Sequence, residues 1–219
     1  MKTKIILLSF IILSFSQFLF AQTDVVNYPS FTGKNSIDLH FGLFDNSGQS
    51  AITISSTSVT TNSTNGFIGS LSYQYWIKEY LSARLSLGAL LIETKTTTGI
   101  INVSTETATL MPILIGVNFY PLQISRANNV LPYVSLAAGP YIGTYTKNEV
   151  AITRIVANET VVESTFGLRI GGGVDFLIGS IFKMGLGVAY HSVSDFKEPI
   201  GGDTNYDGTE YLITIGFIF

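Results

Sequence analysis

The chain has 219 residues, of which 46% are hydrophobic and only 12% are charged, and its formal net charge is −3. This length suits one domain, the charge gives no basic surface for nucleic acid, and the charged fraction is about half of the usual share. With no cysteine, the sequence excludes a disulfide framework, a thiolate metal site and a lipid-modified amino-terminal cysteine.

The first 21 residues have the features of a cleaved signal peptide. Two lysines precede an apolar run at residues 5–20, and Ala21 provides a small residue for cleavage. The alternative is a membrane-anchor helix, but the run is shorter than the ~20 residues that a span needs. We therefore divide the chain into a signal peptide (residues 1–21), a periplasmic lead-in (residues 22–34) and one remaining domain (residues 35–219).

In the remaining domain, apolar and polar residues alternate in eight segments, as they do in strands with two different faces. The alternation is cleanest over residues 80–92, where every second residue from Leu81 to Leu91 is apolar. Pro112 removes one ladder hydrogen bond, so we expect a bulge or a kink there. The predicted strands are residues 35–44, 66–76, 80–92, 108–120, 131–145, 165–177, 181–192 and 209–219.

The connections between these strands alternate in length. Short connections fall at residues 77–79, 121–130 and 178–180, and long segments rich in Ser, Thr, Asn and Gly fall at residues 45–65, 93–107, 146–164 and 192–208. This order predicts an all-β fold, an eight-stranded antiparallel up-and-down transmembrane β-barrel with short turns in the periplasm and long loops outside. A water-soluble barrel of the lipocalin kind is the rival, but it would reverse the pattern and has too little interior for so many large apolar residues.

The last predicted strand ends on an aromatic residue and has one wholly apolar face, formed by Tyr211, Ile213, Ile215, Phe217 and Phe219. It resembles the terminal strand of outer-membrane β-barrel proteins. With its signal peptide, alternating strands and alternating loop lengths, the chain as a whole is similar to the small outer-membrane barrel family of the outer-membrane protein A and X type. The resemblance implies outer-membrane lipid around the barrel and an insertion machinery that reads the C-terminal strand. We expect no peptidoglycan-binding domain after Phe219.

The inward positions predict a lumen filled by side chains, because eight strands enclose little space. If residues 178–180 form the turn, Asp175 faces Lys183, Gly171 faces Gly187 and Gly173 faces Gly185. We further expect Arg84 to join Asp38 near the periplasmic end, with Arg169, His191 and Glu210 higher up.

His191 invites an enzymatic hypothesis, because some barrels of this size modify lipids. The lipid A deacylase family uses a His and a Ser two residues apart on one strand face. Here Val193 holds that position, and Ser192 and Ser194 lie on the opposite face, where no base could reach them. We therefore predict no catalytic residue and no enzyme, and interpret His191 as part of a lumenal polar network.

Two further motifs are weak. Asp203, Asn205 and Asp207 have the spacing that opens a calcium-binding loop, but the position of the closing Glu is Thr214, inside a strand. An ordinary turn is therefore the better interpretation, and calcium binding is the alternative. The run of glycines at residues 171–173 lacks the helix that follows a phosphate loop. We predict neither a metal nor a cofactor.

The long loops carry the functional hypothesis. Residues 51–61, 94–107 and 150–162 are rich in Thr, Val and Ile, which favour strands, so we expect β-rich hairpins that extend the barrel beyond the membrane. Their edges could bind a protein or another surface by β-augmentation. Disordered loops that only shield the surface are the alternative. For the whole chain, the predicted role is a structural or adhesion protein, and a small pore or a lipid-modifying enzyme is the alternative.

Overall fold

The computed structural model describes residues 30–46, 51–54, 58–63, 65–99, 102–121, 129–151, 154–200 and 204–219. The predicted signal peptide and most of the lead-in therefore lie outside the described residues. Within these ranges, no helix has the length and hydrophobicity to cross a membrane.

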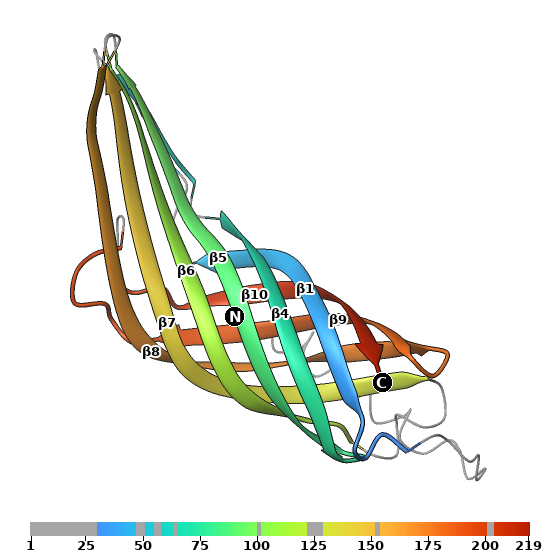
Figure 1. Ribbon diagram of the computed structural model, residues 1–219. Coiled ribbons are helices and arrows are strands. Elements are labelled where there is room, and N and C mark those ends of the chain that lie inside the picture. Colours follow the sequence, from blue (N-terminus) through green and yellow to red (C-terminus); the bar gives the residue numbers. More distant parts are fainter. Residues whose placement is uncertain are drawn as a thin grey trace, which may run out of the picture.

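Eight antiparallel strands close into a barrel (Figure 1). Each one pairs with the next barrel strand along the chain, and the last closes the ring by pairing with the first, for example Ile215 with Leu39. The predicted up-and-down eight-stranded barrel is thus confirmed. Its strands are β1 (Asn35–Asn46), β4 (Asn65–Lys78), β5 (Leu81–Gly99), β6 (Asn102–Phe119), β7 (Val130–Ala151), β8 (Arg154–Ile178), β9 (Phe182–Val193) and β10 (Gly208–Ile218).

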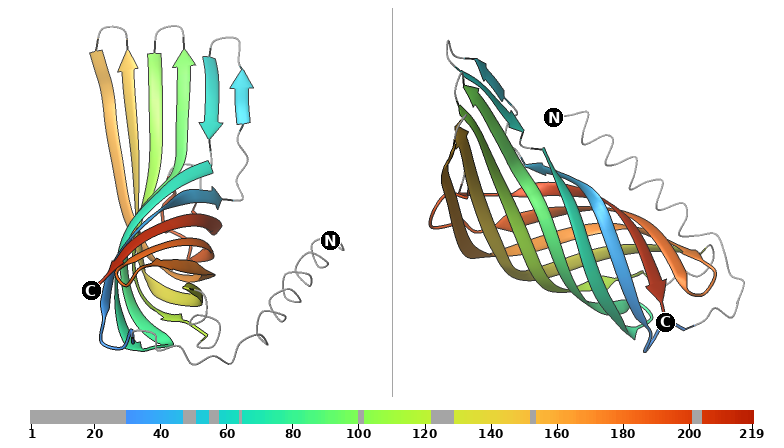
Figure 2. Two further views of the ribbon diagram at one scale, coloured as in Figure 1. Left: turned by 90° about the vertical axis from the view of Figure 1, so that its right-hand side faces the viewer. Right: turned by 45° about the horizontal axis from the view of Figure 1, so that its top comes forward.

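Four of these strands, β5 to β8, continue beyond the barrel at one end. The hairpin of β2 (Ala51–Ile54) and β3 (Ser58–Ser63) pairs with the upper part of β5, so that an open sheet rises above the barrel (Figure 2). We call this the projecting sheet; it comprises β2, β3 and residues 93–99, 102–108, 145–151 and 154–165. We call the end of the barrel that carries the projecting sheet the sheet end. The opposite end, which carries the short turns and Phe219, is the turn end.

The projecting sheet confirms the expected β-rich hairpins. It also corrects the strand ends predicted at residues 92, 108, 145 and 165, because the Thr- and Val-rich segments beyond them continue the same ladders.

Side chains alternate between an apolar outer face and a mixed inner face. Phe41, Leu85 and Ile213 point outward and are exposed, whereas Asp38 and Arg84 point inward and are buried. No residue that we predicted to face outward is buried. The arrangement is the reverse of a water-soluble barrel, as the alternation predicted.

The register between β8 and β9 differs from the prediction by two residues. The turn comprises residues 179–181 instead of 178–180, and Gly179 takes a positive φ of 68°, which glycine adopts without strain. Because the shift is even, every side chain keeps its predicted face. The observed pairs are Asp175 with Gly185, Gly173 with Gly187, and Gly171 with Ala189.

Of the bulge or kink expected at Pro112, the bulge is absent from the described ladder between β5 and β6. The register is the same on both sides, from the Leu87–Ile113 pair to the Leu90–Leu110 pair. Pro112 has no N–H to donate, and the ladder is interrupted between these two pairs without an inserted residue. The Pro112 ring fills the space that a side chain at Gly88 would need. The register shift of this strand pair lies instead between Leu91 and Glu93.

Candidate functional site

The interior near the turn end holds a buried cation between two carboxylates. Nζ of Lys183 lies 3.0 Å from Asp38 Oδ2 and 3.4 Å from Asp175 Oδ2, and all three side chains are almost fully buried. The same ammonium donates to Gln74 Oε1 at 3.5 Å, and the Gln74 amide donates to the hydroxyl of Tyr120 at 3.0 Å. The predicted contact of Asp175 with Lys183 therefore forms, but diagonally across the corrected register.

The ion pair of Asp38 is with Lys183 and not with Arg84, so the predicted pairing of Arg84 with Asp38 is wrong. The Asp38 carboxyl lies over Gly216, whose missing side chain leaves room for it, on the β10 side of β1. Arg84 stands on β5, on the other side of β1, and its Nη2 donates to Nε2 of His40 at 3.0 Å. The sequence showed both charges on the inner face but not the direction of either side chain.

A second network lies nearer the sheet end, as predicted. Both Nε and Nη2 of Arg169 contact Glu210 Oε1, the first at 2.5 Å, and Nη1 donates to Ser135 at 3.2 Å. Nε2 of His191 lies 3.0 Å from Glu210 Oε2, and its Nδ1 lies 2.8 Å from the hydroxyl of Tyr141. The carboxylate thus has a partner for each oxygen, an arrangement that stabilises a buried charge.

The placement of His191 bears on the enzymatic hypothesis. Its ring is buried in this network, whereas Ser192 and Ser194 are exposed. Neither hydroxyl therefore stands where the imidazole could take its proton.

Apolar clusters fill the barrel at both ends of the polar column. At the turn end, Trp76 packs on Tyr120 with ring centroids 4.4 Å apart, and Phe31 of the lead-in stacks on Trp76 at 5.0 Å. At the sheet end, the segment after β9 folds inward, and Phe196, Ile200 and Tyr206 are buried against Phe44 and several leucines.

This inward fold was not predicted. The segment reads as a polar loop, and the only signal was its three large apolar residues.

The possible calcium loop adopts a hydrogen-bonded turn in its described part. Oδ1 of Asp207 accepts from the backbone N–H of Val193 at 2.7 Å, and the Asn205 amide donates to Asp195 at 2.8 Å. Asp203 lies outside the described residues. Within the described part of the chain, no group of three or more His, Asp or Glu side chains is arranged to hold a metal ion.

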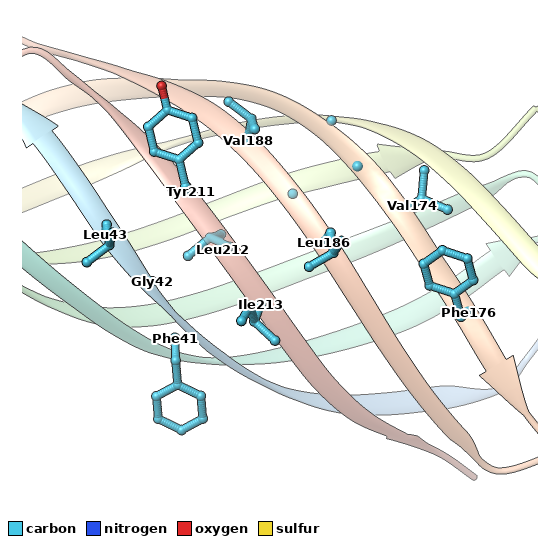
Figure 3. A pocket seen from close by; sticks show the side chains of 13 residues that line it. Phe41, Gly42, Leu43, Val174, Phe176, Leu186, Val188, Tyr211, Leu212 and Ile213 are labelled. Carbon is cyan, nitrogen blue, oxygen red and sulfur yellow. The ribbon is translucent and has the colours of Figure 1, made fainter. Parts of the chain in front are cut away.

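An apolar groove of about 580 Å³ crosses the outer wall over β1, β10, β9 and β8 (Figure 3). Figure 3 shows Phe41, Leu186, Ile213 and Phe176 around it. Gly172 lies in its floor, where the outer face lacks a side chain. Apart from the hydroxyl of Tyr211, the lining side chains are hydrocarbon, so the groove is part of the apolar outer face.

The projecting sheet has an open edge on β8. Among the described residues, β9 pairs with β8 only from Gly167 onward, so the part of β8 above that point pairs with β7 alone. Ser194 donates its N–H to the carbonyl of Phe166 at 2.9 Å, which shows that the backbone groups of Phe166 point away from β7. Alternate residues of a strand share this direction. Val162 and Thr160 therefore present backbone donors and acceptors at the open edge.

Comparison with known proteins agrees with this architecture. A family model described as "Outer membrane protein beta-barrel domain" matches residues 30–219. No curated protein matches the chain.

Several solved structures share the fold at low sequence identity. OprG from Pseudomonas aeruginosa is 15% identical, with a TM-score of 0.52, covering 86% of this chain and 96% of that chain. Ail, the attachment invasion locus protein of Yersinia pestis, in complex with the heparin analogue sucrose octasulfate, is 14% identical, with a TM-score of 0.50, covering 86% and 99%. Neisserial surface protein A is 10% identical, with a TM-score of 0.50, covering 87% and 98%.

Proposed function

The chain belongs to the outer membrane protein β-barrel domain family, and on this premise we propose that it is a plugged barrel whose projecting sheet binds a protein or another surface outside the cell. It is an outer-membrane protein whose apolar outer face meets lipid. The proposal places the projecting sheet on the extracellular side and the short turns in the periplasm, as in other barrels of this kind.

The filled interior supports a plug over a pore. Large buried side chains close both ends of the column, with Trp76 and Tyr120 at one end and Tyr141 and Tyr206 at the other. Between them, ion pairs and hydrogen bonds join side chains from strands that do not pair with each other, as Lys183 on β9 does with Asp38 on β1 and with Gln74 on β4. Eight strands leave an interior that such side chains can fill.

Purified protein in planar bilayers is therefore expected to give no large, steady single-channel conductance. The control is a variant in which Phe196, Ile200 and Tyr206 are replaced by serine, which opens the sheet end but leaves the turn end closed by aromatic rings. It should stay non-conducting if both ends act as plugs. Steady conductance from the wild type would contradict this part of the proposal and favour the small pore.

The observation that carries the binding role is the open edge of β8. An extended edge offers unpaired N–H and C=O groups, which soluble and membrane proteins normally cover or interrupt. Here Thr160 and Val162 are exposed and uncharged, and neither is proline, so the edge keeps its capacity to pair. Ail, which shares the fold, is named for attachment and was solved with a heparin analogue, so the architecture is compatible with surface binding.

Two prolines at this edge provide a test. The double variant T160P/V162P removes two N–H groups that face away from β7, so the ladder to β7 should survive. We expect cells that express it to attach to a panel of immobilised extracellular proteins no better than cells without the protein. The matched control T160A/V162A keeps both N–H groups and should attach as the wild type does.

Heat-modifiable gel mobility would show that both variants are folded barrels. Attachment by the proline variant at the wild-type level would contradict β-augmentation at this edge. If replacement of residues 51–61, 94–107 and 150–162 by short Gly/Ser turns also left attachment unchanged, the projecting sheet would not be the binding surface.

The enzyme alternative has less support. The catalytic pair that it needs would join His191 to a hydroxyl, but the contacts of this ring are Glu210 and Tyr141, inside the barrel. We therefore propose that the protein is not an enzyme, and mass spectrometry of lipid A after overexpression is the direct test.

A further inference from the structure

The projecting sheet, which rises above the barrel in Figure 2, has two faces with different surroundings. Successive residues of a strand point to opposite sides, so the inner face continues the lumenal side of the barrel wall and the outer face continues its lipid side. On the inner face, Ala108 and Tyr145 pack into the apolar cluster at the sheet end. On the outer face, Thr160 and Val162 are exposed. At its base, the inner face therefore adjoins the filled lumen and the outer face adjoins the lipid side of the wall.

The charged residues of the described sheet all occupy inner-face positions. Glu106 and Lys147 pair directly across β6 and β7, with an ion pair of 3.6 Å. The registers place Lys95 opposite Glu106 and Glu159 opposite Lys147, so this row alternates in sign from β5 to β8. Opposite charges at paired positions stabilise a sheet. The other charged residues, which alternation assigns to the same face, are Glu93, Glu149, Arg154 and Glu163.

The outer face carries hydroxyl and amide residues instead. Thr107 pairs with Thr146, and Thr146 pairs with Thr160, so these three threonines form one row. The registers extend the row to Thr94 on β5 and Ser63 on β3. A second row lies two residues farther up each strand, about 7 Å away, and comprises Thr61, Thr96, Thr105, Asn148 and Asn158. Within the described strands, no outer-face position of the sheet carries a charge.

Water on both sides would not produce this segregation, because charged residues suit any surface that water covers. Strand preference explains threonine in these segments, but it does not explain why one face carries every charge. The outer face is therefore suited to surroundings that form hydrogen bonds and carry no charge.

The outer face is also continuous with the lipid-facing wall of the barrel. Below the two rows it presents Met111 and Phe166, which are 47% and 56% exposed. With the sheet on the extracellular side, as proposed above, the hydroxyl rows stand above the hydrocarbon, at the level of the outer-leaflet headgroups. The row between the two regions mixes both characters and comprises Leu91, Thr109, Thr144 and Val162.

We propose that the outer face of the projecting sheet binds the neutral sugars of glycolipids in the outer leaflet around the barrel. Hydroxyl and amide groups both donate and accept hydrogen bonds, as sugar hydroxyls do, so rows of them suit an uncharged polyhydroxylated ligand. Lipid phosphates are disfavoured, because this face lacks the Arg and Lys donors that bind phosphate strongly. Binding of the sugars requires the extracellular orientation proposed above, but not pairing at the β8 edge.

Neighbouring residues on opposite faces give a matched test, because the chain has no cysteine of its own. Thr107→Cys places a thiol on the outer face, and Glu106→Cys places one on the inner face at the same height of β6. Each variant is refolded into phosphatidylcholine vesicles that contain either complete lipopolysaccharide or lipid A alone, and is labelled with a water-soluble maleimide. Complete lipopolysaccharide should slow the labelling of Thr107→Cys several-fold relative to lipid A and leave that of Glu106→Cys unchanged.

Two pairs of hydroxyls provide an equilibrium test. T107V/T146V removes a cross-strand pair from the outer face and T60V/T97V removes one from the inner face, and both keep a β-branched side chain that favours strands. The probe is the polysaccharide that mild acid releases from lipopolysaccharide, titrated calorimetrically into the refolded protein. The loss of two neutral hydrogen bonds should weaken binding roughly tenfold in T107V/T146V. T60V/T97V should bind as the wild type does.

Equal labelling of the two thiols in both kinds of vesicle would overturn the proposal. Equal slowing of both thiols would also overturn it, because the sugars would then crowd the whole sheet without preference for a face. Unchanged affinity of T107V/T146V would do the same. None of these results bears on the β8 edge, whose test is the attachment of cells that express T160P/V162P, so failure of sugar binding and failure of β-augmentation are distinguishable.

Discussion

Deletion of Phe217, Ile218 and Phe219 is expected to abolish recovery of the protein in the outer membrane, together with its heat-modifiable gel mobility. These residues close the ring at the turn end. Phe217 pairs with Ile37 on one side and Phe182 on the other, and Phe219 exchanges two backbone hydrogen bonds with Asn35, at 2.8 and 2.9 Å. Without them, β1 and β9 would expose unpaired backbone groups to hydrocarbon, which a barrel in a membrane cannot sustain.

Point substitutions at Phe219 test whether the insertion machinery reads the terminal aromatic ring. Phe219→Tyr keeps the ring and the backbone and should be recovered normally, whereas Phe219→Ala keeps only the backbone. If closure alone matters, both point variants should insert, and if the machinery reads the aromatic ring, Phe219→Ala should fail. Membrane fractionation that recovers the three-residue deletion at the wild-type level would contradict the prediction.

The sequence was sufficient for the fold because each barrel strand has two chemically different faces. Every second residue from Leu81 to Leu91 is apolar, and this period both identifies the strand and assigns its lipid face. The Thr-rich parts of β5 and β6 in the projecting sheet lack an apolar face in the sequence. Their strand structure could be predicted from propensity alone, and their length could not.

The interior was only partly predictable. Alternation places Lys183, Asp38 and Arg84 on the inner face, but it does not say which neighbour a long side chain reaches. That depends on register and on open space, such as the room over Gly216 that draws Asp38 toward Lys183. A one-residue error in the position of the β8–β9 turn moved every predicted pair by two.

Replacement of Lys183 by methionine is expected to be the most destabilising conservative change in the lumen. Methionine keeps most of the volume and removes the charge, leaving Asp38 and Asp175 buried without a cation. Loss of one partner from a buried ion pair typically costs about 3–5 kcal/mol, because the remaining charge is uncompensated. We expect a loss of this size in the free energy of unfolding, measured by urea titration of the barrel refolded in vesicles.

Two further variants separate charge from packing. Lys147→Met removes a cation from a partly exposed pair with Glu106, at 3.6 Å, and should cost less than about 1 kcal/mol. The triple variant K183M/D38N/D175N removes all three charges, so it should recover much of the stability that K183M loses. If the triple variant were as unstable as K183M, the ammonium would stabilise the barrel through packing and its hydrogen bond to Gln74. A loss in K183M no greater than in K147M would show that water reaches the carboxylates and replaces the cation.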